Sequence, residues 1–150
     1  MVRLCLGGYI MTIRTVRINT KNEVNKELLT QMHRTCFNLP LPYTDGQWWI
    51  AYDGMNPVGF CAVNPSFQWQ KTGYLLRSGV MPDYRGRGLQ KRFIKLRIKY
   101  AKEQGWDWLV TDTRYNPASV NSLISCGFRL YKPSNPWSFK DAMYWRRKVS

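Results

Sequence analysis

Two arginines and two glycines alternate in the segment Arg85-Gly86-Arg87-Gly88, between a strand-like run that ends at Pro82 and a helical pattern that begins at once. Glycine lets backbone N–H groups approach a phosphate closely, and a helix start carries unpaired N–H donors and a dipole that favours negative charge. The arginines can add charge-assisted hydrogen bonds to the same oxygens. A Gly-x-Gly pair alone is equally typical of a tight connection. The arginines, the strand and the helix together favour an anion-binding turn.

A second polar segment precedes a short apolar run further along the chain. Asn116 and Ser119 stand in front of this run, which closes at Gly127. Asn or Ser in this position is a common helix cap and needs no ligand. Because the segment follows the basic turn at a suitable distance, a contribution to the same ligand site is the other interpretation, and the two segments together favour it.

Residues 80–89 resemble the pyrophosphate motif of the GNAT N-acetyltransferases, in which Arg/Gln-x-x-Gly-x-Gly/Ala follows a strand that ends Val-x-Pro. Gln90 departs from the last position of the motif, where Gly or Ala is usual, but it keeps a backbone donor. Residues 116–119, with the Gly-Phe pair at 127–128, resemble the second signature of the family. The likeness covers about residues 12–148.

The resemblance implies a fold, a cofactor and a set of contacts. The fold is α/β (α+β), a mixed and mostly antiparallel sheet flanked by helices, with a splayed strand pair that holds the cofactor. The cofactor is acetyl-CoA, and the activity is N-acetyl transfer to a primary amine by direct attack. The implied cofactor-binding residues are Ser78, Gly79, Val80, Arg85, Gly86, Arg87, Gly88, Leu89, Gln90, Asn116 and Ser119.

Transfer to an amine requires a group that removes a proton, because a lysine-like amine has a pKa of about 10.4. Asp112 is the first candidate base, since it interrupts a strand that is otherwise expected to be buried. Its alternative role is structural, as a strand-end cap or as a partner of an arginine such as Arg114. Asp45 is the second candidate base and is also typical of a solvated turn.

The departing thiolate needs a proton donor, and the usual one is missing. Members of the family that the chain resembles often carry a tyrosine seven residues after the motif asparagine, where this sequence has Leu123. We expect Tyr115 to substitute, with Tyr131, Tyr144 or water as the alternatives. A backbone N–H near Val80 can stabilise the charge that develops on the thioester oxygen.

The charge balance restricts the acceptor. The chain has 23 Lys and Arg against 9 Asp and Glu, a formal charge of +14. Such a surface repels a polycationic acceptor and suits a lysine or N-terminus on an acidic protein, or a nucleic-acid-borne amine. Tyr43, Asp45 and Trp137 lie in loop-like segments and are the candidate substrate contacts. The alternative function is a non-catalytic nucleic-acid-binding module on the same fold.

The hydrophobic pattern predicts the elements that position these residues. Val24, Leu28, Met32 and Cys36 recur at helical spacing, after a plausible N-cap at Asn22. Period-2 and apolar runs bounded by turn residues predict the strands. We expect helices at 23–37, 88–104 and 118–126, and strands at 12–18, 47–53, 57–63, 74–80, 108–113, 128–131 and 141–148.

Two tryptophans and a lysine stripe carry further expectations. Trp48 and Trp49 point to opposite faces of a strand and cannot both enter the core of a one-sided sheet, so we expect one of them to line a site or an oligomer contact. In the helix predicted at 88–104, a lysine stripe is typical of a solvated outer face. Its members are Lys91, Lys95, Lys99 and Lys102.

Length and composition predict one domain over residues 12–150, preceded by a lead-in at 1–11 that lies outside the fold. The four cysteines have no CxxC pair, which argues against a metal site and favours reduced thiols in a cytoplasmic protein. The chain has no apolar run long enough for a membrane span. We expect a monomer or a homodimer.

Overall fold

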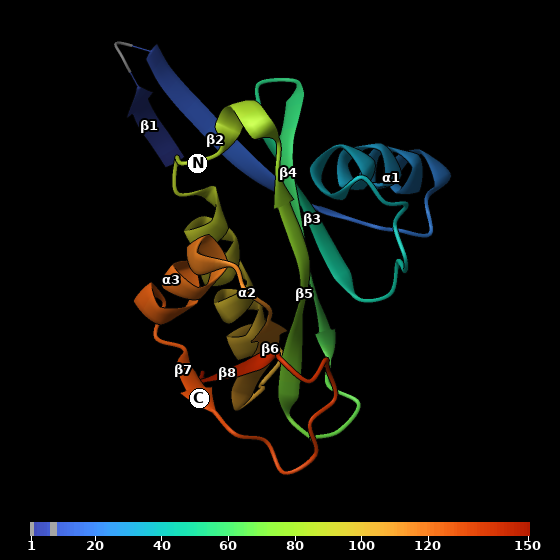
Figure 1. The fold of residues 1–150 in the computed structure, drawn as a ribbon. Helices are drawn as coiled ribbons and strands as arrows, with labels where there is room; N and C mark the ends of the chain where they lie inside the picture. The colour runs from blue at the N-terminus through green and yellow to red at the C-terminus, as the bar shows by residue number, and fades with distance from the viewer. Residues whose placement is uncertain (1, 7–8) are drawn as a thin grey trace. The chain divides into compact units, whose positions relative to one another are not determined.

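The computed structural model describes residues 2–6 and 9–150, with side chains from residue 12 onward. Its strands and helices form a mixed α/β architecture (Figure 1). The elements are β1 (Val2–Leu6), β2 (Tyr9–Ile18), α1 (Glu23–Phe37), β3 (Gln47–Asp53), β4 (Asn56–Pro65), β5 (Thr72–Val80), the single turn η1 (Pro82–Tyr84), α2 (Leu89–Glu103), β6 (Trp108–Thr113), α3 (Pro117–Ser125), β7 (Arg129–Tyr131) and β8 (Met143–Lys148).

The strands follow the order β1-β2-β3-β4-β5-β6-β8-β7 in one sheet. The pairs β1–β2, β2–β3, β6–β8 and β7–β8 are antiparallel, and β5–β6 is parallel. The predicted fold class, a mixed and mostly antiparallel sheet with helices, is therefore confirmed. The predicted helices and strands are all present, with ends that differ by a few residues.

The chain divides into two compact units, which are described one at a time. The first unit contains Met1–Ala62 and Arg77–Leu89, and the second contains Val63–Leu76 and Gln90–Ser150. Within the first unit, the backbone of β1 pairs with β2 from Val2 opposite Ile13 to Leu6 opposite Tyr9. A single domain over residues 12–150, with residues 1–11 outside it, stays a prediction.

In the first unit, α1 lies beside β3 and β4 (Figure 1). The predicted N-cap is confirmed, because the Asn22 side chain accepts a hydrogen bond from the Asn25 N–H at 3.1 Å. The predicted apolar face is partly wrong. Val24 is 77% exposed, whereas Leu29, Met32 and His33 are buried. The helix therefore turns a face that includes an ionisable side chain inward, which apolar spacing alone could not indicate.

Both tryptophans of β3 are buried. Trp48 is 0% exposed and donates its Nε1–H to the Asp45 carbonyl at 2.9 Å, and Trp49 is 2% exposed with the Arg17 guanidinium 6.0 Å from its ring. The expectation that one of them lines a site or an oligomer contact is thus wrong. Because adjacent side chains of a strand point in opposite directions, the burial of both shows that neither face of β3 is exposed at these two positions.

In the second unit, the parallel ladder between β5 and β6 is short. It pairs Thr72–Tyr74 with Trp108–Val110 and does not extend further. Beyond the ladder, side chains donate hydrogen bonds to the next carbonyls of β5. The Thr111 hydroxyl donates to the Leu75 carbonyl at 3.2 Å, and Arg97 Nη1 donates to the Leu76 carbonyl at 3.2 Å. Arg97, on α2, is only 2% exposed. On the edge of β5 that faces β6, these side chains hydrogen-bond to backbone carbonyls beyond the end of the ladder.

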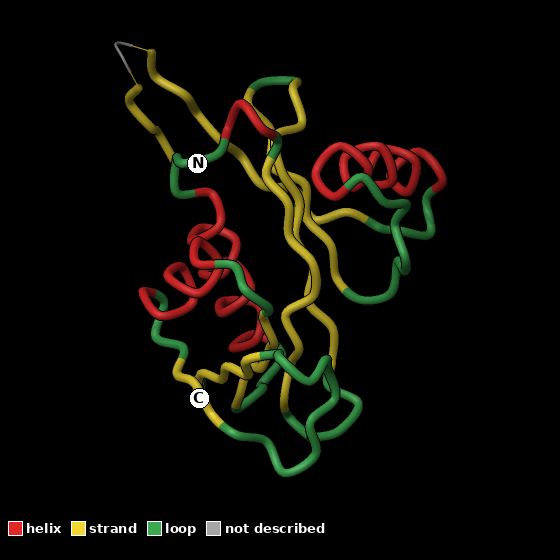
Figure 2. Tube along the Cα trace, in the orientation of Figure 1, coloured by secondary structure: helices red, strands yellow, loops and turns green. Residues whose placement is uncertain are grey.

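The helices of the second unit lie against each other, with Cys126 Sγ 3.9 Å from the Lys91 carbonyl (Figure 1). The predicted lysine stripe of α2 is exposed throughout. The chain between β7 and β8 has no regular structure (Figure 2). Among the residues that the structure describes, no helix is both long enough and apolar enough to span a membrane.

Candidate functional site

The basic turn of the first unit has the backbone expected of an anion site. β5 ends at Val80, η1 follows, and α2 begins at Leu89. Gly86 has φ +75° and Gly88 has φ +80°, backbone values that residues other than glycine rarely adopt. A Cβ at either glycine would meet no atom within 4 Å. Conformation rather than crowding requires these glycines, and their backbone borders open space.

The two arginines of the turn are held differently. Arg85 is exposed, and its Nε donates to the Val80 carbonyl at 3.1 Å. The Arg87 guanidinium lies 4.8 Å from the centroid of the Tyr84 ring. The Tyr84 hydroxyl in turn donates to Asp53 Oδ2 at 2.7 Å. Stacking of Arg87 on Tyr84 restrains its stem and leaves guanidinium N–H groups for an anion.

Val80 and Gly79 are tied into the core of the first unit. The Val80 carbonyl receives Arg85 Nε and also lies 3.5 Å from Cys36 Sγ. Burial raises the pKa of the Cys36 thiol, and the charge of Arg85 opposes this shift. A Cβ on Gly79 would lie 2.6 Å from the Phe60 ring. Glycine at position 79 is therefore required by packing, whatever else this strand end binds.

The implied cofactor residues of the second unit lie at the starts of α2 and α3. Asn116 caps α3, because its Oδ1 accepts the Ser119 N–H at 3.2 Å. Gln90 is in the first turn of α2. Leu123, at the place of the family's frequent tyrosine, is 5% exposed and packs in the core. The Asn116 side chain thus acts as a helix cap, as the first interpretation expected, and cofactor binding at this segment stays a prediction.

The candidate base Asp112 sits in an aromatic cluster of the second unit. Its Oδ1 accepts hydrogen bonds from the Tyr74 hydroxyl and from Trp137 Nε1, the latter at 3.1 Å. The Trp137 ring packs edge-on against the rings of Tyr74 and Tyr144, with centroids 6.1 Å and 4.5 Å away. The structure thus brings the predicted base and the predicted substrate contact Trp137 together.

The suggested pairing of Asp112 with Arg114 is wrong. Arg114 is 3.5 Å from Asp141 instead, and both side chains are largely exposed. Tyr74 was missed by sequence reasoning. It is 38 residues from Asp112, and only the strand pairing of β5 with β6 makes them neighbours.

The remaining candidates are exposed. Tyr115 is 92% exposed, so its proposed role as proton donor has no supporting contact. In the first unit, Tyr43 is 36% exposed with its ring 6.4 Å from Trp48, and the Asp45 side chain is exposed. No group of three or more metal-ligating side chains occurs in the part of the chain that the structure describes.

A family model described as the Acetyltransferase (GNAT) family matches residues 18–128. No curated protein sequence matches the chain. The chain is similar to the ribosomal-protein-S18-alanine N-acetyltransferase of Escherichia coli, with a TM-score of 0.73, 15% identity, and coverage of 93% of this chain and 95% of that chain.

Two further solved structures are similar to this chain. An acetyltransferase of the GNAT family from Staphylococcus aureus Mu50 has a TM-score of 0.73, 20% identity, and coverage of 93% of this chain and 100% of that chain. The structure of yncA from Salmonella typhimurium, solved with its cofactor acetyl-CoA, has a TM-score of 0.70, 16% identity, and coverage of 93% and 94%. At these identities the likeness shows a shared fold.

Proposed function

Because the chain belongs to the GNAT acetyltransferase family, we propose that it transfers an acetyl group from acetyl-CoA to a primary amine. The observation that carries this proposal is the turn between β5 and α2. There, two glycines with positive φ and two arginines precede the first turn of a helix. Unpaired N–H groups, the helix dipole and guanidinium groups all favour a diphosphate at this place.

The residues of this turn fit the phosphates of acetyl-CoA. The backbone at Gly86 and Gly88 borders open space, Arg85 is exposed, and the Arg87 guanidinium is supported by a ring. We assign phosphate binding to the segment 85–90. Ser78, Gly79, Val80, Asn116 and Ser119 remain proposed contacts of the rest of the cofactor. When bound, acetyl-CoA supplies the activated acetyl group as a thioester.

Asp112 is our candidate for removing the proton of the acceptor amine. Both of its hydrogen bonds reach Oδ1, so Oδ2 is the atom proposed to take the proton, directly or through water. Tyr74 and Trp137 hold the carboxylate in one orientation, which is the usual requirement of a positioned base. Tyr115 stays our proposed donor to the leaving thiolate. A backbone N–H near Val80 is proposed to stabilise developing negative charge.

The acceptor is proposed to be an amine on an acidic protein or a nucleic acid, because the chain carries a formal charge of +14. Tyr43, Asp45 and Trp137 are the proposed acceptor contacts, and a cytoplasmic location fits such acceptors. The family match and the similar structures lend no support to the alternative of a non-catalytic nucleic-acid-binding module.

Calorimetric titration with acetyl-CoA tests the proposal. Arg85→Glu should weaken binding by about 100-fold, because it replaces a charge-assisted donor with a repulsive carboxylate. The matched control is Arg34→Glu, which makes the same charge reversal at an exposed position in the last turn of α1 and should leave affinity unchanged. Absence of acetyl-CoA binding by the unmodified protein, or an equal loss in both variants, would contradict the proposal.

A further inference from the structure

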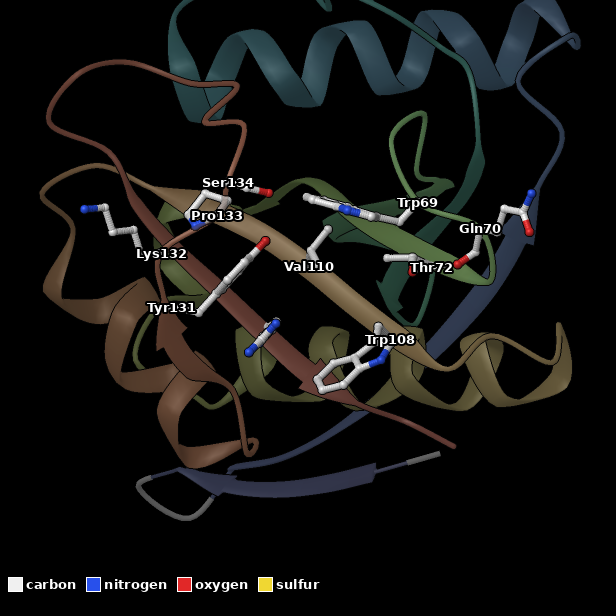
Figure 3. Close-up of a pocket in the computed structure, with 10 residues that line it drawn as sticks. Trp69, Gln70, Thr72, Trp108, Val110, Tyr131, Lys132, Pro133 and Ser134 are labelled. Atoms are coloured by element: carbon white, nitrogen blue, oxygen red, sulfur yellow. Dashed lines mark hydrogen bonds between the residues drawn. The ribbon is translucent and has the colours of Figure 1, made fainter.

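The second unit contains a cavity of about 540 Å³, and its lining includes none of the residues proposed above to bind acetyl-CoA or the acceptor. Its wall comes from the start of β5, from β6 and β8, from the end of β7, and from the loops that adjoin β5 and β7 (Figure 3). A volume of this size is typical of sites for small molecules, which span about 300–1,000 Å³. The cavity is large enough for one or two fused rings.

Aromatic rings and one guanidinium shape this cavity. Trp69, Trp108 and Tyr131 line it, and Arg146 reaches it from β8. The Arg146 guanidinium lies 5.2 Å from the centroid of the Trp108 ring and 4.6 Å from that of Tyr131. Contacts with two ring faces hold the cation in place while leaving its in-plane N–H donors for another partner.

The lining is cationic and contains no carboxylate. Arg146 and Lys132 both contribute, and within residues 12–150 neither has an ion-pair partner. Two acids stand close to the lining residues of β6 in sequence, Asp107 directly before Trp108 and Asp112 two residues after Val110, and neither is part of the lining. Asp112 Oδ1 accepts hydrogen bonds from Tyr74 and Trp137. The cavity therefore attracts an anion and offers a ring-shaped ligand aromatic surfaces.

The hydroxyl of Tyr131 is the third polar feature. Its oxygen is buried and has no hydrogen-bond partner among the described residues. In the view of Figure 3, the Tyr131 side chain points toward Ser134, and its hydroxyl ends beside Val110. Burial raises the pKa of Tyr131, against the lowering effect of Arg146, so the hydroxyl is protonated at neutral pH and can donate. Buried hydroxyls without partners are uncommon in folded proteins, and a ligand acceptor would satisfy this one.

We propose that this cavity binds a small planar aromatic molecule that carries an anionic group. The ring packs against Trp69 and Trp108, the anion pairs with Arg146 and Lys132, and the Tyr131 hydroxyl donates to it. The anionic group of this ligand class is a carboxylate or a phosphate, since both pair with guanidinium and ammonium groups. The site contains no residue proposed above to bind acetyl-CoA or the acceptor, but its Trp69 ring lies 5.5 Å from the ring of the proposed acceptor contact Trp137.

The test uses NMR spectra of the full chain titrated with three probes: naphthoate, its neutral isostere naphthamide, and acetate, an anion without a ring. Naphthoate should shift the Trp69 and Trp108 indole N–H signals in a saturable way. Naphthamide should bind about tenfold more weakly, because it lacks the charge that pairs with Arg146. Acetate should cause no saturable shift. Comparison of naphthoate with phenyl phosphate then distinguishes carboxylate from phosphate ligands.

Arg146→Gln should lower naphthoate affinity about tenfold and leave naphthamide binding unchanged. Lys102→Gln is the matched control, since it removes one exposed charge from α2 outside the cavity, and should change neither. If Arg146→Gln does not fold, Tyr131→Phe decides, because it removes only the buried hydroxyl and should weaken naphthoate binding several-fold. Equal binding of naphthoate and naphthamide, or naphthoate binding insensitive to the folded variants, would overturn the proposal.

Discussion

His33 shows how a single side chain can link the core of the first unit to pH. It is 0% exposed, and its Nδ1 lies 2.8 Å from the Leu39 carbonyl. Because a carbonyl only accepts, Nδ1 carries the hydrogen and Nε2 is unprotonated and buried. Burial lowers the pKa of His33 below 6.5, the Leu39 hydrogen bond opposes the shift, and the charge of Arg77 adds to it.

The protein should lose stability as the pH falls below the ordinary histidine pKa. Between 6.5 and the lower folded value, the unfolded chain binds a proton that folded His33 does not, so the free energy of unfolding decreases there and is fully retained above 6.5. His33→Asn keeps an N–H for Leu39 but cannot titrate. Its loss of stability between about pH 7.5 and about pH 5.5 should be smaller, by up to about 1.4 kcal/mol per pH unit.

Urea unfolding of the two proteins at both pH values measures this difference. The comparison cancels the contribution of the carboxylates that both proteins share. Equal pH dependence in the two proteins would show that His33 is not the group responsible.

At the scale of elements, β5 begins in a tight parallel ladder and continues with side-chain partners. Its first residues pair with β6, and its next carbonyls are served by Thr111 and Arg97. Close approach in the ladder requires Gly73 opposite Leu109, where the Trp106 ring lies directly over the backbone. The glycine lets the indole cover the start of the strand.

Gly73→Ala should destabilise the protein by about 1–3 kcal/mol, as expected for overpacking in a core. The added Cβ would lie 2.2 Å from Trp106 Cζ3 and 2.8 Å from Leu109 Cδ2, so side chains or backbone must move. Urea unfolding measures the loss. In the double variant with Trp106→Leu, the added cost of Gly73→Ala should be smaller, because the obstructing ring is gone. A fully additive pair would contradict this account of the ladder.

At the scale of the whole molecule, the dominant property is the formal charge of +14. Exposed charge acts beyond individual contacts, by raising the local concentration of oppositely charged partners and the rate at which they associate. The exposed lysine stripe of α2 is one continuous part of this charge. The charge of the whole molecule should therefore favour acidic acceptors over basic ones, because acidic acceptors associate with it faster.

Peptides with one lysine in acidic surroundings should be acetylated with a kcat/KM about tenfold higher than the same lysine in basic surroundings. The advantage should shrink at high salt, where charges are screened beyond a few ångströms. A variant with glutamine at all four positions of the lysine stripe of α2 should lose part of this preference for acidic peptides. Mass spectrometry of the acetylated peptides gives the rates. An equal preference at low and high salt would rule out steering by charge.

Local features were predictable from the sequence. The turn at 85–88 and the N-cap at Asn22 follow from the residues that form them, because backbone conformation and capping depend on a few neighbours along the chain. The periodic and apolar patterns likewise predicted α1, α2, α3 and strands β2 to β8, with ends that differ by a few residues. These signals report each segment's own hydrogen bonding and apolar spacing, which need no knowledge of the rest of the chain.

Tertiary structure alone decided which distant side chains meet. Asp112 pairs with Tyr74 and Trp137 rather than with nearby Arg114, because strand register and a long loop bring those partners to it. Burial of both Trp48 and Trp49 depends on cover from both sides of a sheet. The cavity around Arg146 likewise exists only where four strands and two loops converge. Partners of this kind depend on contacts across the fold, and a one-dimensional pattern does not contain them.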